Sequence, residues 1–142
     1  MTTGTETTTV TRALVPEHDR SHFVDALFGI NFPMQLEPCV FAVASELSSD
    51  YRGGYWAFQS LGNGGFYMAP DDDARFTVRS ENGFEGTMTA DAFGVTVCLY
   101  AYSRLSFIAT KPAATTYVRH YRLLREYAMD HPEVAEIIRT TD

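Results

Sequence analysis

The sequence predicts an α+β fold in which a small antiparallel sheet of three to four strands, built around a central hairpin, packs against four to five helices. An aromatic stretch with an Asn-Gly turn signal occupies residues 51–70, and a run of alternating apolar residues follows it. Residues 89–110 form a long apolar segment that begins with helix-capping residues. These three observations predict a meander of strands beside one central helix.

Two helices are predicted before the hairpin. Residues 16–28 form an amphipathic pattern with acidic residues at its start, and Gly29 suits the position just after a helix. Residues 31–37 are interpreted as a connector. Pro38 then opens a second helix over residues 39–47, whose apolar character indicates burial.

The hairpin is predicted from residues 51–70, which read YRGGYWAFQSLGNGGFYMAP and include Trp56, the only tryptophan. The GNGG segment at residues 62–65 separates two β-prone runs, which is a strong signal for a hairpin turn. Side chains alternate across a strand, so Trp56 and Phe58 share one face, yet both faces carry large apolar groups. One face is expected to pack on helices, and the other is either covered or available to a partner.

Further strands are expected after the hairpin. The three aspartates of residues 71–73 are interpreted as a polar turn, because a calcium or magnesium loop needs spaced ligands and a later acid. Residues 75–79 alternate cleanly, and a turn at residues 81–83 leads to a short strand over residues 84–88. The middle of the chain is thus predicted to be one antiparallel meander.

Residues 89–110 are interpreted as one long helix, although residues 95–97 locally favour a strand. Thr89 is a suitable N-cap and Asp91 lies in the first turn. Arg104 would be costly inside a bilayer, which argues against a membrane span. We therefore expect this segment to be the central core helix.

Two shorter helices are predicted to end the chain. Thr115 or Thr116 would cap the first, and Arg122 and Glu126 have the spacing of an exposed ion pair. Pro132 suits the first position of the last helix. The buried face of the first of these helices is expected to carry Tyr117, Tyr121, Leu124 and Ala128.

The composition is that of an ordinary globular domain. Of the 142 residues, 45% are hydrophobic and 20% are charged, enough for a core without disulfides or a structural metal. Cys39 and Cys98 belong to no CxxC pair, as expected for reduced thiols in a cytoplasmic protein. We expect residues 1–13 to be a flexible, threonine-rich tail with no signal-peptide layout and a strand near residues 10–15, and residues 14–142 to form a single domain.

The net charge is −7, from 18 acidic and 11 basic residues. An acidic surface does not neutralise phosphates, so no stable direct DNA binding is expected. Apart from residues 71–73 the acids are scattered among arginines, and charge alone gives little support for DNA mimicry. His18 and His22 lie four residues apart, but no third ligand follows, so neither a metal site nor a cofactor is predicted.

No catalytic pattern stands out. The sequence has no GxSxG motif, and the glycines of residues 62–65 lie between strands rather than before a helix, where a phosphate would bind. A Ser-His-Asp set assembled only by the fold stays open, because its members need not be neighbours in sequence. From these residues alone, the prediction stops at a soluble α+β domain with an aromatic hairpin.

The hairpin segment resembles the ArdB/KlcA family of antirestriction proteins. The family hallmark is Tyr-x-Gly-Gly-Tyr-Trp-x-Phe followed by Asn-Gly-Gly-Phe-Tyr-Met-Ala-Pro, which matches residues 51–58 and 63–70. Further matches are Phe28-Gly29, Thr89-Ala90-Asp91-Ala92 and His131-Pro132-Glu133. The resemblance therefore extends, in order, over nearly the whole chain after the tail.

The resemblance implies a small cytoplasmic protein, carried on plasmids and other mobile elements, that counters type I restriction-modification systems and helps unmodified DNA survive. It implies action without catalysis and a compact α+β fold. The implied partner is a type I restriction-modification enzyme or an associated host protein, and no membrane association is implied.

Three functional hypotheses follow. The first is an inhibitor that acts by protein contact, because Tyr and Trp dominate interface hot spots. The alternative is that the same aromatic side chains form the core. Tyr55 and Tyr67 are expected to be exposed, and Asn63 is expected mainly to form the turn. The candidate contact residues are Tyr51, Tyr55, Trp56, Phe58, Asn63 and Tyr67.

The second hypothesis is a weak DNA mimic that competes with DNA for the restriction complex in a salt-sensitive way. Its candidate residues are Asp71, Asp72, Asp73, Asp130, Glu133 and Glu136. The third hypothesis is a small enzyme, for which the sequence offers only scattered polar residues. We rank the three hypotheses in this order.

Overall fold

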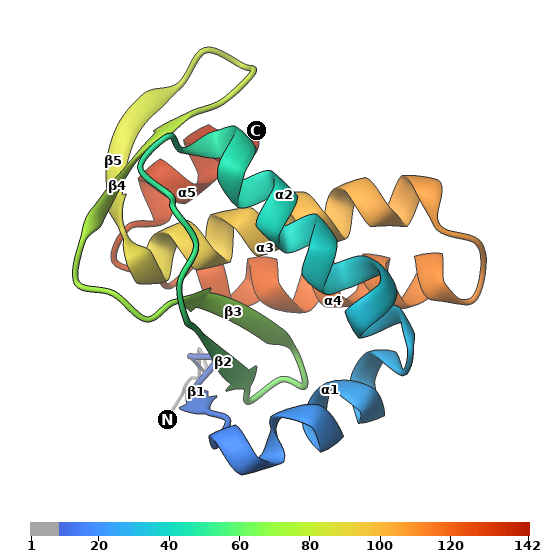
Figure 1. The fold of residues 1–142 in the computed structure, drawn as a ribbon. Helices are drawn as coiled ribbons and strands as arrows, with labels where there is room; N and C mark the ends of the chain where they lie inside the picture. Colours follow the sequence, from blue (N-terminus) through green and yellow to red (C-terminus); the bar gives the residue numbers. More distant parts are fainter. Residues whose placement is uncertain (1–8) are drawn as a thin grey trace, which may run out of the picture.

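A computed structural model describes residues 9–142, so most of the tail predicted for residues 1–13 lies outside the described residues. Within this range the chain forms five α-helices and two small antiparallel sheets, with the helix α3 at the centre (Figure 1). The elements in chain order are β1 (Arg12–Leu14), the 3₁₀ turn η1 (Glu17–Asp19), α1 (Arg20–Phe28), the π-helical turn η2 (Phe32–Leu36), α2 (Glu37–Leu47), β2 (Trp56–Leu61), β3 (Phe66–Pro70), β4 (Arg75–Arg79), β5 (Glu85–Thr89), α3 (Ala90–Ile108), α4 (Ala113–Ala128) and α5 (Val134–Thr141).

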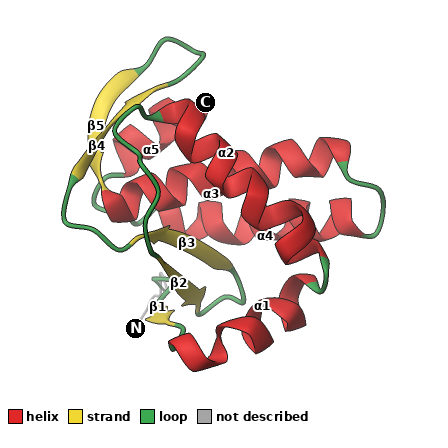
Figure 2. Ribbon diagram, viewed as in Figure 1, coloured by secondary structure: helices red, strands yellow, loops and turns green. Residues whose placement is uncertain are grey.

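The strands form two sheets and not the single meander that the sequence predicted. β1, β2 and β3 make one sheet, whereas β4 and β5 make a separate two-stranded ribbon (Figure 2). The prediction of one meander is wrong because the outer edge of β3 is covered by α3 instead of by β4. The Tyr102 hydroxyl donates to the carbonyl of Phe66 (2.7 Å), and the Cys98 sulfur lies 3.5 Å from both the nitrogen and the oxygen of Met68. Covering an edge in this way prevents pairing with another strand.

The long core helix is confirmed. Thr89 is its N-cap, because its side-chain oxygen accepts a hydrogen bond from the backbone N–H of Ala92 (3.2 Å). The helix is buried over most of its length. Gly94 allows the close approach to β3, since a Cβ atom at this position would overlap the Cβ atom of Ala69.

The predicted hairpin is also confirmed, and both of its faces are covered. β2 and β3 pair with Trp56 opposite Pro70. On one face the rings of Phe58 and Phe66 lie 5.3 Å apart and contact η2 and α1. On the other face the ring of Tyr67 stacks on Tyr127 of α4, with 5.5 Å between centroids. The hairpin is therefore mainly a core element.

The connector predicted for residues 31–37 is wrong. The chain forms the π-helical turn η2 there and continues directly into α2. The helical segments Glu17–Phe28 and Phe32–Leu47 meet at an angle of 93°. Gly29 makes the corner with a positive φ of 59°, as its predicted place after the first helix requires. Within residues 9–142, no single helix combines the length and the apolar character needed to cross a membrane.

The ends of the last two helices differ from the prediction. α4 begins at Ala113 after Pro112, and not after a threonine cap, because the fixed φ of proline already suits a helix start. α5 begins at Val134, two residues after Pro132. The buried face of α4 holds Tyr117, Leu124 and Ala128 as predicted, together with His120, whereas Tyr121 is half-buried.

The Arg122–Glu126 ion pair predicted on α4 is wrong as well. Among residues 9–142 no ion pair joins these two side chains. The Glu126 carboxylate accepts instead from the Asn63 amide of the hairpin turn (2.7 Å). A tertiary contact therefore replaces the local pair.

His120 makes the stability of the fold depend on pH. Its ring is buried, and the centroid of the ring lies 4.7 Å from that of Phe28. Burial, together with the nearby charge of Arg119, lowers the pKa of His120 to about 4. An unfolded histidine titrates near 6.5, so the unfolded state binds the proton first as the pH falls. We predict that His120 causes a loss of roughly 3 kcal/mol in the free energy of unfolding between about pH 6.5 and about pH 4, and no further loss below.

Urea unfolding at pH 7 and pH 4.5 tests this prediction. A His120→Leu variant should lose less stability between these two pH values than the unchanged protein. Equal losses for the two proteins would assign the pH dependence to other groups.

Candidate functional site

The structure buries most of the aromatic residues that were predicted to make contacts. Trp56 and Phe58 lie in the core, and Tyr67, which was predicted to be exposed, is fully buried because β3 turns it toward α4. Tyr51 is half-buried, and its hydroxyl accepts a hydrogen bond from the Trp56 indole N–H (3.2 Å). Among these candidate contact residues only Tyr55, with 50% of its surface exposed, presents a large aromatic surface to solvent.

Asn63 forms the turn, as predicted, and also ties the hairpin to α4. Its side-chain oxygen accepts from the backbone N–H of Gly65 (3.0 Å). Its amide group donates to the carbonyl of Leu123 (2.9 Å) and to the carboxylate of Glu126. Asn63 is thus held by the fold and has little freedom to contact a partner.

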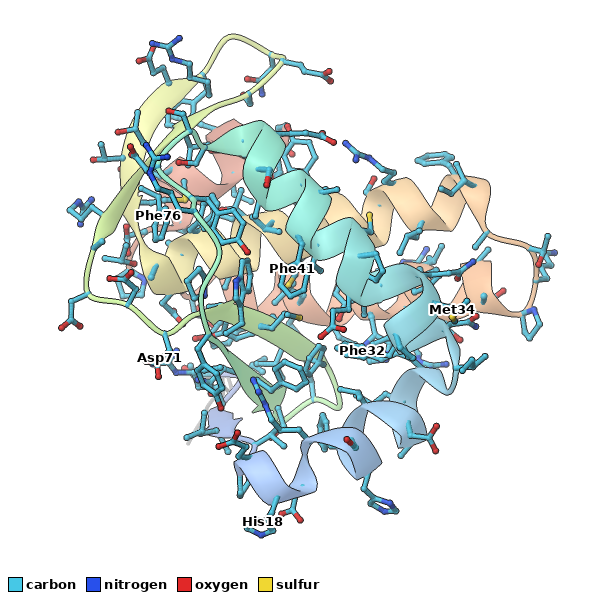
Figure 3. All side chains as sticks on the ribbon, in the orientation of Figure 1. His18, Phe32, Met34, Phe41, Asp71 and Phe76 are labelled. Atoms are coloured by element: carbon cyan, nitrogen blue, oxygen red, sulfur yellow. The ribbon has the colours of Figure 1, made fainter. Side chains whose placement is uncertain are left out.

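The acidic candidates are divided between two places in the fold. Residues 71–73 are exposed in the turn between β3 and β4, where Figure 3 labels Asp71. Asp130, Glu133 and Glu136 lie before or within α5. The Glu133 carboxylate points inward and accepts from the backbone N–H (2.9 Å) and the hydroxyl (2.5 Å) of Thr89. It is therefore not part of an open acidic surface.

Three of the segments that resemble the ArdB/KlcA family meet at Asp91. One carboxylate oxygen accepts from the Tyr67 hydroxyl (2.7 Å) and from the Arg12 guanidinium (2.5 Å). The other oxygen lies 2.8 Å from Nε2 of His131. We call Arg12, Tyr67, Asp91 and His131 the Asp91 network. It joins β1, β3, the first turn of α3 and the segment before α5.

The hydrogen bonds of the Asp91 network determine its protonation. Nδ1 of His131 accepts from the backbone N–H of Glu133 (3.0 Å), so the ring proton lies on Nε2 and is donated to Asp91. Burial acts to raise the pKa of the Asp91 carboxyl, but the hydrogen bonds from His131 and Tyr67 and the charge of Arg12 lower it below its ordinary value. Burial and the charge of Asp91 raise the pKa of Tyr67 well above its ordinary value.

The Asp91 network is therefore built to hold elements together. Both carboxylate oxygens of Asp91 and both ring nitrogens of His131 already have protein partners. A general acid or base needs a proton site that a substrate can reach. Asp91 and His131 belong to the segments that carry the family resemblance, but nothing in the sequence predicts their contact. Arg12 was not a predicted site residue, because it lies at the end of the predicted tail.

A groove on the other side of the hairpin reaches the surface. It lies between α1, η2 and β2 and has a volume of about 500 Å³. We call it the α1 groove. It is lined by Glu17, Arg20, Ser21, Val24, Asp25, Gly29, Ile30, Phe32, Pro33, Glu37 and Phe58.

Arg20 connects the α1 groove to the aromatic hairpin. Its guanidinium lies 3.7 Å from the centre of the Phe58 ring and 4.8 Å from that of Tyr55, and it donates to the carbonyl of Trp56. Its Nε is buried and has no hydrogen-bond partner within residues 9–142. A buried donor without a partner is uncommon in folded proteins. Arg20 therefore contacts three hallmark residues of the predicted contact set, Tyr55, Trp56 and Phe58, although it was not itself a predicted site residue.

Charge and exposed apolar surface occur together at the α1 groove. Three carboxylates, from Glu17, Asp25 and Glu37, line it, and within the described part of the chain none of them forms an ion pair. Ile30 lines the groove with 70% of its surface exposed, and Met34 in the same η2 region is 68% exposed. Exposed apolar side chains bordered by polar groups are typical of a surface that contacts a partner.

Both the fold and the sequence place this chain among antirestriction proteins. The profile of the Antirestriction protein family matches residues 49–142. The antirestriction protein KlcA of Escherichia coli is 39% identical over 141 residues, which cover 98% of this chain and 99% of the relative. The uncharacterized protein YafX of Escherichia coli K12 is 41% identical over 132 residues, which cover 90% of this chain and 85% of the relative.

A solved structure extends this similarity to the fold. It comes from a study of the KlcA and ArdB proteins, which show a novel fold and antirestriction activity against type I DNA restriction systems in vivo but not in vitro. The structure is 39% identical in sequence, has a TM-score of 0.88, and the match covers 99% of this chain and all of that one. The chain belongs to the Antirestriction protein family, which confirms the resemblance noted in its sequence.

The Asp91 network is expected to contribute to stability. An Asp91→Asn variant keeps the shape of the side chain but loses the charge that three donors share, so we predict a loss of about 2 kcal/mol in the free energy of unfolding in urea. Asp130→Asn is the matched control, because Asp130 is exposed outside the network. Equal stability of the two variants would show that the network does not hold the elements together.

Proposed function

We propose that this protein counters type I restriction-modification systems and so protects unmodified DNA that enters a cell on a mobile element. The observation that carries the proposal is the match over 99% of the chain to a structure of the KlcA and ArdB proteins. Those proteins show antirestriction activity against type I DNA restriction systems. A shared fold and 39% sequence identity over the full length of both chains support the same activity here.

The proposed action is contact with a protein, without catalysis. The acid–base groups of the Asp91 network are engaged with one another and with the backbone. The lining of the α1 groove includes one serine, Ser21, but no histidine, which is the base that most often activates a serine. Nucleophilic catalysis by serine needs an adjacent base. These features favour binding over a chemical reaction.

The proposed contact surface is the α1 groove together with Tyr55. Arginine and tyrosine are enriched among residues that dominate interface energies, and Arg20 and Tyr55 lie side by side here. The KlcA and ArdB proteins are active in vivo but not in vitro. A partner present in the cell but missing from a reaction of purified components explains this difference, so we propose a host protein associated with restriction as the contacted molecule.

A weak DNA mimic receives less support from the geometry. The acidic candidates are divided between the turn at residues 71–73 and the region of α5, and Glu133 is bonded to Thr89. A mimic needs a row of carboxylates that follows the spacing of DNA phosphates.

Truncation of the contact residues tests the proposal. Arg20→Ala and Tyr55→Ala should each reduce antirestriction at least tenfold, measured as the plating efficiency of unmodified phage on cells with a type I system. A loss of about 1.4 kcal/mol in binding corresponds to this factor. Phe107→Ala is the matched control, because Phe107 is 86% exposed at the end of α3, away from the groove lining.

Full antirestriction activity of the folded Arg20→Ala and Tyr55→Ala variants would show that the groove is not needed for the activity. Circular dichroism and thermal unfolding establish folding, which matters most for Arg20 because it supports Phe58. Loss of activity in the Phe107→Ala control as well would also contradict the assigned surface.

A further inference from the structure

We propose that the α1 groove binds a short basic segment of a protein partner, in which an arginine or lysine is flanked by an apolar side chain. This inference rests on the proposed function, because it names the chemistry of the partner at the same surface. It is carried by the charge of the groove, by its apolar floor and by the orientation of Arg20.

The charge of the lining is complementary to a cation. Glu17, Asp25 and Glu37 contribute three negative charges, and Arg20 contributes one positive charge. The guanidinium of Arg20 stacks on Phe58 and donates to the carbonyl of Trp56, and among the described residues it forms an ion pair with none of the three carboxylates. Within residues 9–142 no ion pair neutralises the three carboxylates, so their negative charge is available to a bound cation. Opposite charges across an interface favour association and select the partner.

The carboxylates come from both arms of the groove. Glu17 and Asp25 belong to the η1–α1 arm, and Glu37 begins α2 on the other arm. The two arms meet at 93°, so the acids flank the space between them. A side chain that enters this space meets negative charge from both helical arms.

The floor of the groove accounts for the apolar part of the proposed segment. Phe32 and Phe58 lie at its base with rings 5.6 Å apart, and Ile30 lines it with most of its surface exposed. A volume of about 500 Å³ falls in the range of roughly 300–1,000 Å³ of sites that enclose small ligands. The groove therefore suits a few side chains rather than a whole helix.

Other occupants fit this chemistry less well. The phosphates of duplex DNA and the headgroups of anionic lipids would be repelled by the three carboxylates. A second copy of this chain could offer Arg119 and Arg122, which are exposed on α4. Binding of a DNA duplex or of a second copy would overturn the proposal, and the experiment therefore includes both.

The test measures the binding of fluorescent peptides to the full chain by polarisation. The probe is a hexapeptide that alternates arginine and leucine. Two comparison peptides replace arginine by glutamate or leucine by serine. We expect both replacements to weaken binding at least tenfold, and we expect binding of the probe to weaken as salt is raised.

A charge-neutralised variant locates the binding. Asp25→Asn combined with Glu37→Gln should weaken binding of the arginine–leucine peptide at least tenfold. Asp71→Asn combined with Asp73→Asn removes the same charge from an exposed turn and should bind the peptide as the unchanged protein does. Equal effects of the two double variants would show that overall charge, and not the groove, attracts the peptide.

Three further results would overturn the proposal: equal affinity for all three peptides, tighter binding of a DNA duplex than of the probe, or self-association that the probe disrupts.

The phage assay distinguishes failure of the basic-segment proposal from failure of the proposed function. If Arg20→Ala loses protection while the Asp25 and Glu37 double variant keeps it, the proposed contact surface is supported and the proposal of a basic segment is contradicted. If both variants keep protection, both proposals fail.

Discussion

The contact between α3 and the outer edge of β3 is the constraint on which the rest of this structure depends. Gly94 permits the helix to lie against the strand, and Tyr102 and Cys98 contact the backbone of Phe66 and Met68 along that edge. An edge strand left open is prone to pair with other chains. Because a helix covers this edge, the sheet ends at three strands, and the next two strands form their own ribbon.

The hairpin held by this contact has a structural side and a side that reaches the surface. Toward α4, Tyr67 stacks on Tyr127 and leads into the Asp91 network, which connects the beginning, middle and end of the described chain. Toward α1, Phe58 supports Arg20 at the α1 groove. The same aromatic segment thus forms the core and positions the surface that we propose for contact, so the two interpretations of its sequence are compatible.

Much of the fold could be predicted because its signals are local. The turn at Asn63, the N-cap at Thr89 and the corner at Gly29 each depend on the conformational preferences of one or two residues. The division into two sheets could not be predicted, because it depends on a helix that approaches one strand edge through Gly94. The start of α4 was missed because the threonine signal competes with Pro112, which ends the preceding loop.

Less of the candidate site than of the fold could be predicted from the sequence. Tyr55 was correctly expected to be exposed, whereas the prediction for Tyr67 failed because alternation along a strand does not say what covers each face. Arg20 lies in an ordinary amphipathic pattern, and its stacking on Phe58 depends on the packing of α1 beside the hairpin, which is far away in the sequence. The carboxylates of the α1 groove come from separate helical segments, and only the 93° corner brings them to one surface.

The central claim is that this protein acts by contact at the α1 groove. The most direct measurement places a photo-crosslinking phenylalanine analogue at position 55 in cells that carry a type I system, with position 107 as the comparison. The account predicts an adduct from position 55, and not from position 107, to a peptide that contains arginine or lysine. An active protein with no adduct at position 55, or with its only adducts at position 107, would contradict it.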